Sequence, residues 1–282
     1  MIPTFVIFLR EGIEAAMIVA ILLAYLKRAN QRHLFRDVYV GVASAFGLIT
    51  VGGVAAYLLI DQYSGSKVQT YFETTTYLLA AAILTYMTFW MQSHARGLSH
   101  DLSERSEAAI TKGGRFGLSL LAFQAVGREG VETMVFTLAI IFANSRKAGT
   151  PVHGNLIWLG AILGIVFALA IAIGIYRLGA KINLKIFFRT LGLALMIFAA
   201  GLLADAVQNM QELNWLPFMH HAIWNSSGLI AENSNIGDIL HSLLGYAERP
   251  TVLQALVWVA YISVGTTLYI RLGRPKKKLT SV

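Results

Sequence analysis

Seven long apolar stretches, separated by short polar segments, dominate the chain. Each is about 20 residues or longer, which is the length an α-helix needs to cross the hydrocarbon core of a bilayer. A bilayer favours helices because their backbone polar groups are hydrogen-bonded internally. The pattern therefore predicts an all-α polytopic membrane protein with seven transmembrane helices. The predicted spans are 4–26, 39–60, 72–92, 116–143, 155–176, 187–209 and 251–271.

Two polar segments also show helical patterns. Apolar residues recur at helical spacing after Ile236 and stop at Gly245, which predicts a short amphipathic helix that lies on the membrane surface or covers the bundle. The stretch 99–112 is expected to form another short helix, ending at Gly113 and Gly114. We expect one transmembrane domain over 1–282. Its parts are 1–92 and 116–209 as three-helix repeats, 210–250 as an outer amphipathic segment, 251–271 as the seventh span, and 272–282 as a basic cytoplasmic tail.

The composition supports a membrane protein and excludes several other classes. Of the 282 residues, 56% are hydrophobic and 13% are charged, about half the charged share of a typical soluble domain. The chain contains no cysteine. Disulfide scaffolds, cysteine-ligated zinc, iron–sulfur clusters and thiol catalysis are therefore excluded.

The distribution of Lys and Arg predicts the orientation. Of the 23 basic residues, 17 lie in the segments 27–38, 93–115, 177–189 and 271–278. All four segments fall on one side of a seven-span topology, and the positive-inside rule makes that side cytoplasmic. We therefore expect an outer N-terminus, a cytoplasmic C-terminus, and a multi-pass location in the plasma membrane, in a bacterium the inner membrane. The basic tail is expected to contact anionic lipid rather than nucleic acid.

One charged motif occurs twice inside apolar spans. The first span contains Arg10-Glu11-Gly12-Ile13-Glu14, and the fourth contains Arg128-Glu129-Gly130-Val131-Glu132. A charged side chain in a bilayer costs at least about 2.5–3.5 kcal/mol, so these six charges indicate a function. At 100° per residue, the three charges of each motif fall within one sector of about 100° and face the bundle interior or a water-filled path.

The topology predicts that the two motifs meet. The first and fourth spans run in opposite directions, so spans one to three and four to six resemble inverted repeats, which place a substrate site near the membrane midplane. We expect Gly12 and Gly130 to let the two helices approach closely. The glutamates Glu11, Glu14, Glu129 and Glu132 would then form a four-carboxylate cluster with a net charge of −2 after Arg10 and Arg128 are counted, which suits a hard multivalent cation.

Other interpretations of the motifs stay open at this point. The Arg–Glu pairs could only lock two helices together, although each motif has one acid more than that needs. The glutamates could relay protons in a carrier of another divalent cation or a small solute. An intramembrane metalloenzyme is disfavoured because all seven histidines fall outside the spans. Fe³⁺, Fe²⁺ and Mn²⁺ all accept carboxylate ligands.

The doubled motif in the first and fourth of seven spans resembles the oxidase-dependent iron permease family, which includes the fungal high-affinity iron permeases, and most closely its bacterial EfeU-type members. The resemblance extends to Leu243-Leu244-Gly245-Tyr246 and Arg249-Pro250. It implies a permease that imports ferric iron and is not an enzyme. It also implies that the four motif glutamates bind Fe³⁺ as transported substrate with no permanent cofactor, that both arginines are needed, and that a separate extracytoplasmic oxidase or peroxidase and an iron-binding protein assist.

Further residues have weaker signals. Glu73 and Asp205 lie near predicted outer helix ends and are candidates for capturing a cation at the outer side. His220, His221 and His241 offer ligand atoms but form no complete set, so a surface position is expected. The sequence predicts a packing and interface role for Met87 and Met91, with Trp90.

Overall fold

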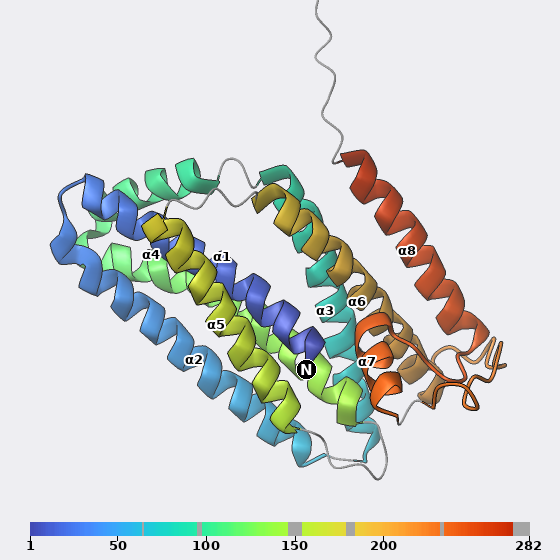
Figure 1. The fold of residues 1–282 in the computed structure, drawn as a ribbon. Coiled ribbons are helices and arrows are strands. Elements are labelled where there is room, and N and C mark those ends of the chain that lie inside the picture. Colours follow the sequence, from blue (N-terminus) through green and yellow to red (C-terminus); the bar gives the residue numbers. More distant parts are fainter. Residues whose placement is uncertain (64, 95–97, 146–153, 179–183, 232–233, 273–282) are drawn as a thin grey trace, which may run out of the picture.

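The computed structural model describes residues 1–63, 65–94, 98–145, 154–178, 184–231 and 234–272. The regular structure of this part of the chain is helical, with one isolated bridge between Ala222 and Thr251 (Figure 1). The helices are α1 (Ile2–Arg28), the short 3₁₀ helix η1 (Arg32–Leu34), α2 (Phe35–Asp61), α3 (Lys67–His94), α4 (Leu98–Ser145), α5 (Gly154–Leu178), α6 (Leu184–Glu212), α7 (Asn235–Leu244) and α8 (Val252–Leu272). The basic tail beyond residue 272 lies outside the described residues.

Every predicted span falls on a helix, and the all-helical prediction is confirmed. Within the described residues, four stretches are long and apolar enough to cross a membrane on length and composition alone: Arg32–Leu59, Ile157–Gly174, Thr190–Glu212 and Val252–Arg271. The helices α1 and α4 carry the charged motifs inside their apolar stretches, and α3 carries Glu73 and a run of threonines. Seven spans and their orientation therefore remain a prediction.

The helix α4 has a break where the sequence predicts one. Gly114 has φ 56° and ψ −137°, outside the helical region and favourable for glycine, so the helix changes direction there. The part before Gly114 corresponds to the short helix predicted over 99–112. The part after it carries the second motif along the bundle.

The predicted amphipathic helix is present as α7. The Ser234 side chain caps its first turn by accepting a hydrogen bond from the Gly237 backbone N–H at 3.0 Å, and Gly245 ends it with φ 67°. Among the side chains of α7 that the structure describes, Ile236 is exposed and His241 is buried, which departs from the predicted apolar stripe. The helix α7 contacts α1, α4 and α6, so it covers the end of the bundle where α1 begins.

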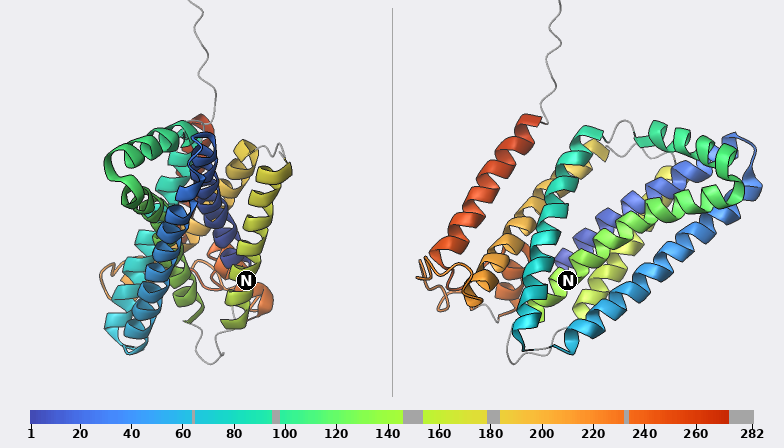
Figure 2. Two further views of the ribbon diagram at one scale, coloured as in Figure 1. Left: turned by 90° about the vertical axis from the view of Figure 1, so that its left-hand side faces the viewer. Right: turned by 180° about the vertical axis from the view of Figure 1, so that it is seen from behind.

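The long helices form two groups. The pairs α1–α5, α2–α4 and α1–α4 pack extensively and make one group, whereas α3, α6 and α8 make the other. Figure 1 and the right-hand view in Figure 2 show the groups close together where α1 begins and diverging toward the end where α1 and α3 finish. Most of the contact between the groups runs through α3 and α4.

Small residues let the helices of the first group approach closely. On α5, Gly160, Gly164 and Ala168 face α1: a Cβ on Gly164 would lie 2.8 Å from the Phe5 carbonyl oxygen. On α2, Gly41 and Ala45 face α4 with the same four-residue spacing. Small residues four apart on one helix face are typical of tightly packed membrane helices.

The prediction that Gly12 and Gly130 let the two motif helices approach each other closely is wrong. A Cβ on Gly12 would lie 2.8 Å from Ala168 of α5, and one on Gly130 would collide with Ile49 of α2. Each glycine therefore allows its motif helix to pack against a helix of the other half of the chain. The α1–α4 contact forms on another side of both helices.

These close contacts give a matched prediction for stability. In Gly41→Ala the new methyl group would collide with the Ser119 carbonyl oxygen, whereas a methyl group on Gly47, on the same helix, would meet no atom of the described residues within 4 Å. We expect Gly41→Ala to destabilise the protein by about 1–3 kcal/mol. Gly47→Ala is expected to be neutral or slightly stabilising. Thermal unfolding in detergent would measure both, and equal melting temperatures would contradict the close α2–α4 packing.

Candidate metal centre

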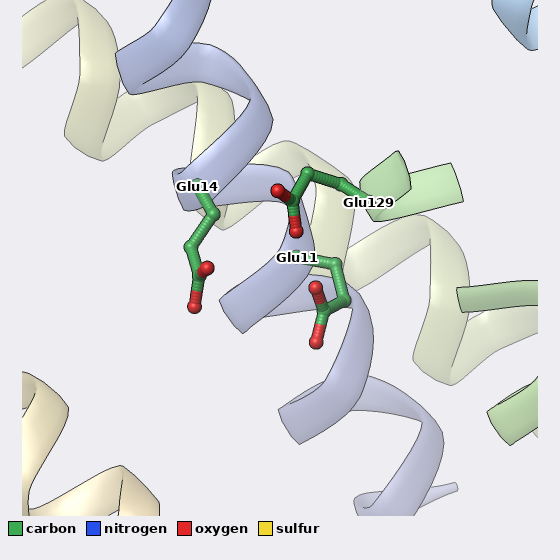
Figure 3. Close-up of side chains that lie close together, drawn as sticks. All are labelled: Glu11, Glu14 and Glu129. Carbon is green, nitrogen blue, oxygen red and sulfur yellow. The ribbon is translucent and has the colours of Figure 1, made fainter. Parts of the chain in front are cut away.

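The two charged motifs meet between α1 and α4. Single carboxylate oxygens of Glu11, Glu14 and Glu129 all lie within 4.8 Å of one another, and all three residues are buried. Figure 3 shows the carboxylates of Glu11 and Glu14, from α1, and of Glu129, from α4, gathered beside α1. The placement follows from local sequence, because residues three apart on α1 share one face and α4 packs directly along that helix.

Arg10 holds both glutamates of the first motif. Its Nη1 lies 3.1 Å from Glu11 Oε1, and its Nε lies 3.0 Å from Glu14 Oε1. The Arg10 side chain is only 4% exposed. One buried guanidinium therefore forms ion pairs with two buried carboxylates and fixes their directions, because its N–H donors lie in one rigid plane.

Arg128 pairs with the second motif in a different environment. Its Nη2 lies 2.9 Å from Glu129 Oε1, but its Nε lies 3.6 Å from Glu132 Oε1. The Arg128 side chain is 51% exposed, and its guanidinium carbon lies 5.3 Å from the centre of the Trp90 ring on α3. Two nearly identical motifs thus have one buried and one half-exposed arginine.

That all four motif glutamates coordinate an ion remains a prediction. In the structure, three of the four carboxylates converge and the fourth lies apart. Glu132 is buried, yet it lies outside the set of three converging carboxylates and pairs with Arg128. It is close enough to Arg10 and Glu14 to interact with them electrostatically. Glu132 therefore contributes negative charge beside the three converging groups.

The arrangement can coordinate a cation through oxygen. Glu11 Oε2 and Glu129 Oε2 are buried without a hydrogen-bond partner in the described structure, so each has lone pairs directed at no donor. The four glutamates and two arginines carry a formal charge of −2 in total. A multivalent cation would remove this imbalance and satisfy the carboxylate oxygens, whereas an apolar solute would do neither.

An apolar cluster closes the site toward the end where α1 begins. Ile7 lies one turn before Glu11, and Phe136 lies one turn after Glu132. Both belong to one buried cluster with Tyr77 of α3 and Leu202 of α6, so this cluster joins the two helix groups. Among the described side chains, the cluster on the other side of the site, around Leu22 and Leu118, contains no residue of α3 or α6.

The candidate capture residues are buried. Glu73 on α3 accepts a hydrogen bond from Gln69 Nε2 at 2.9 Å, and Asp205 lies in the last third of α6. Each lies about one helical turn along its helix from a residue of the apolar cluster: Glu73 from Tyr77 on α3, and Asp205 from Leu202 on α6. Asn209, one turn further along α6, is fully buried, and neither of its amide atoms has a hydrogen-bond partner in the described structure. No sequence signal identified Asn209, because a single amide near a helix end is common in any protein.

One further expectation needs revision. His241 is buried, with Nδ1 2.8 Å from the Tyr246 carbonyl oxygen, so the expected surface position is wrong for this histidine. His220 and His221 are exposed as expected.

Met87 and Met91 are buried in packing, as predicted. Trp90 contacts the motif arginine, which the sequence could not show because helical spacing does not identify the facing helix.

A multi-pass helical bundle with a buried carboxylate site, whose charge two arginines compensate only in part, is typical of a membrane protein that transports ions. The chain belongs to the iron permease FTR1 family, whose model matches residues 1–273. It is similar to the ferrous iron permease EfeU of Escherichia coli O6:K15:H31 (32% identical; 93% of this chain, 92% of the relative) and of Yersinia pestis (33%; 95% and 93%). The protein of the same name from Yersinia pseudotuberculosis serotype I is 34% identical, again over 95% and 93%. No solved structure matches the chain significantly.

Proposed function

We propose that this chain imports iron across the bacterial inner membrane by passing it through the carboxylate site between α1 and α4. The convergence of Glu11, Glu14 and Glu129 within 4.8 Å carries the proposal, because it supplies an oxygen ligand set inside a largely apolar bundle. Arg10 and Arg128 limit the repulsion among the acids while the ion is absent. Family membership supports iron as the ion.

The helix pairing supports two inverted three-helix repeats and a seventh span. Exchanging α1 with α4, α2 with α5 and α3 with α6 converts the α1–α5 pair into the α4–α2 pair. The same exchange maps the α1–α4 and α3–α6 pairs onto themselves. The close contacts of Gly12 with α5 and of Gly130 with α2 follow the same rule. With the charge distribution, this favours an outer N-terminus and a cytoplasmic C-terminus.

In that orientation the apolar cluster around Ile7 and Phe136 closes the outer side of the site. A rocking movement of α3, α6 and α8 against the other group would separate this cluster and admit iron from outside. The reverse movement would expose the site to the cytoplasm, as in transporters built from inverted repeats. The four motif glutamates would hold the ion during transit, Glu11, Glu14 and Glu129 through their converging oxygens and Glu132 through its adjacent charge, with no resident cofactor.

We propose Fe³⁺ as the bound form, because a small, highly charged ion gains most from an all-carboxylate ligand set. A separate extracytoplasmic oxidase or peroxidase would then supply it, with an iron-binding protein. Fe²⁺ is the second candidate, because the similar proteins of Escherichia coli and Yersinia are named ferrous iron permeases.

Uptake of radioactive iron into proteoliposomes tests the proposal. Purified protein would be offered Fe²⁺ under reducing conditions, Fe²⁺ with an added ferroxidase, and chelated Fe³⁺, with Mn²⁺ as competitor and protein-free vesicles as control. Uptake that requires oxidation supports the ferric form, and uptake of reduced iron alone replaces it with the ferrous form. Absence of protein-dependent uptake in all three arms would contradict iron import by this chain.

Glu73 and Asp205 are proposed to capture iron above the apolar cluster, with Asn209 as a neighbour. We expect Glu73→Gln to raise the iron concentration for half-maximal uptake by about tenfold with little change in the maximal rate, because a capture site affects arrival more than passage. Glu212→Gln, which changes the exposed last residue of α6, is the control for a charge change on the same helix. A fall in maximal rate at unchanged half-saturation would contradict a capture role.

A further inference from the structure

The two motif arginines are held in position by different means. Arg10 is enclosed by its own helix group and lies 3.0–3.1 Å from both glutamates of its motif. Arg128 is half exposed, and its guanidinium lies 2.9 Å from Glu129 but 3.6 Å from Glu132, so one of its two ion pairs is loose. An exposed arginine with one close partner keeps much of its rotamer freedom unless another group restrains it. The second motif therefore needs a restraint that the first motif does not.

Trp90 of α3 provides this restraint. Its ring lies 5.3 Å from the Arg128 guanidinium carbon, which is within cation–π distance. A guanidinium on an indole face keeps its edge N–H groups available. Here these edge groups make two contacts with Glu129 Oε1, from Nη2 at 2.9 Å and from Nε at 3.2 Å. The chain of contacts thus runs from Trp90 through Arg128 to one of the three converging carboxylates.

We propose that Trp90 is a positioning residue for the carboxylate site: its ring face orients Arg128, and Arg128 in turn directs Glu129 toward Glu11 and Glu14. The proposal rests on the proposed function of that site. Trp90 belongs to the helix group of α3, α6 and α8, whereas all three carboxylates belong to the other group. The contact between Trp90 and Arg128 therefore makes the geometry of the second motif depend on the relative position of the two helix groups.

The asymmetry between the motifs is the reason to assign this role to Trp90. The two motifs share Arg, Glu, Gly and Glu at the same positions and differ only by Ile13 against Val131, so their intrinsic side-chain preferences are similar. Arg10 needs no aromatic partner because burial and two ion pairs fix it. Loss of the Trp90 ring should therefore weaken the contribution of Glu129 and leave the Glu11–Arg10–Glu14 arrangement intact.

Iron uptake by ring-removing and ring-keeping variants tests the proposal. Trp90→Leu keeps an apolar side chain without a π face, and Trp90→Phe keeps a smaller ring. We expect Trp90→Leu to raise the iron concentration for half-maximal uptake by about tenfold, and Trp90→Phe to restore it to within about threefold of the wild type. Trp158→Leu, an exposed tryptophan on α5, is the matched control and should behave as the wild type.

A double-mutant cycle with Arg128 separates positioning from a packing role. In the Arg128→Gln background the ring has no cation to orient, so Trp90→Leu should cause no further increase in half-saturation. An equal increase in both backgrounds, or equal values for Trp90→Leu and Trp90→Phe, would overturn the proposal. If the wild type transports iron and Trp90→Leu matches it, only the role of Trp90 fails. If the wild type transports none, the proposed function fails and the inference with it.

Discussion

Replacing Glu14 with glutamine is expected to reduce iron uptake by about a hundredfold while the protein remains folded in the membrane. The substitution keeps the shape of the side chain and removes the negative charge from one of three converging carboxylates. Even partners in the outer shell of a metal site change affinity by about 10–100-fold, so loss of a direct ligand should reach the upper end of that range or more. Transport in proteoliposomes, at equal amounts of reconstituted protein, measures the effect.

Two controls make this result specific. Glu104→Gln is the same chemical change at an exposed position of α4, and it should leave uptake unchanged. Iron binding by Glu14→Gln in detergent should fall together with uptake, because the proposed defect lies in binding the ion. Normal uptake by Glu14→Gln would show that the carboxylates only hold α1 and α4 together. Lost uptake with normal binding would place the role of Glu14 in a later step.

The sequence predicted the centre of this site because two signals are local. Charged residues at Glu11 and Glu14 inside an apolar stretch must face the interior, and the second copy of the motif identifies a second helix that does the same. Helical periodicity then determines which side chains share a face. It does not determine which helix that face meets, since this depends on packing between distant segments.

The predictions that were wrong also depend on which helix a given face meets, which the sequence does not determine. Gly12 and Gly130 lie beside the motif charges in sequence, yet on the helix they lie on another side and contact α5 and α2. The motifs are nearly identical in sequence, but α3 brings Trp90 to the arginine of the second motif. The burial of His241 likewise depends on how α7 packs on the bundle end.

Because Arg10 is buried and Arg128 is half exposed, we expect their replacement to affect the stability of the protein very differently. Arg10→Gln removes the guanidinium that pairs with both Glu11 and Glu14, and both glutamates are buried. Breaking a buried ion pair by removing one partner costs about 3–5 kcal/mol, because the remaining charge stays desolvated. We therefore expect Arg10→Gln to lower the melting temperature strongly. Arg128→Gln removes a half-exposed guanidinium and should lower it much less.

A charge-balanced double variant separates stability from transport at Arg10. Combining Arg10→Gln with Glu14→Gln removes one charge of each sign from the buried group, so part of the lost stability should return. Uptake should not return, because the double variant still lacks a ligand carboxylate. Thermal unfolding in detergent and uptake in proteoliposomes would be measured on the wild type, both arginine variants and the double variant.

If Arg10→Gln and Arg128→Gln lower the melting temperature equally, the burial difference between the two motifs has no energetic consequence. If the double variant regains uptake as well as stability, Glu14 acts as a structural partner of Arg10 and the ion path lies elsewhere.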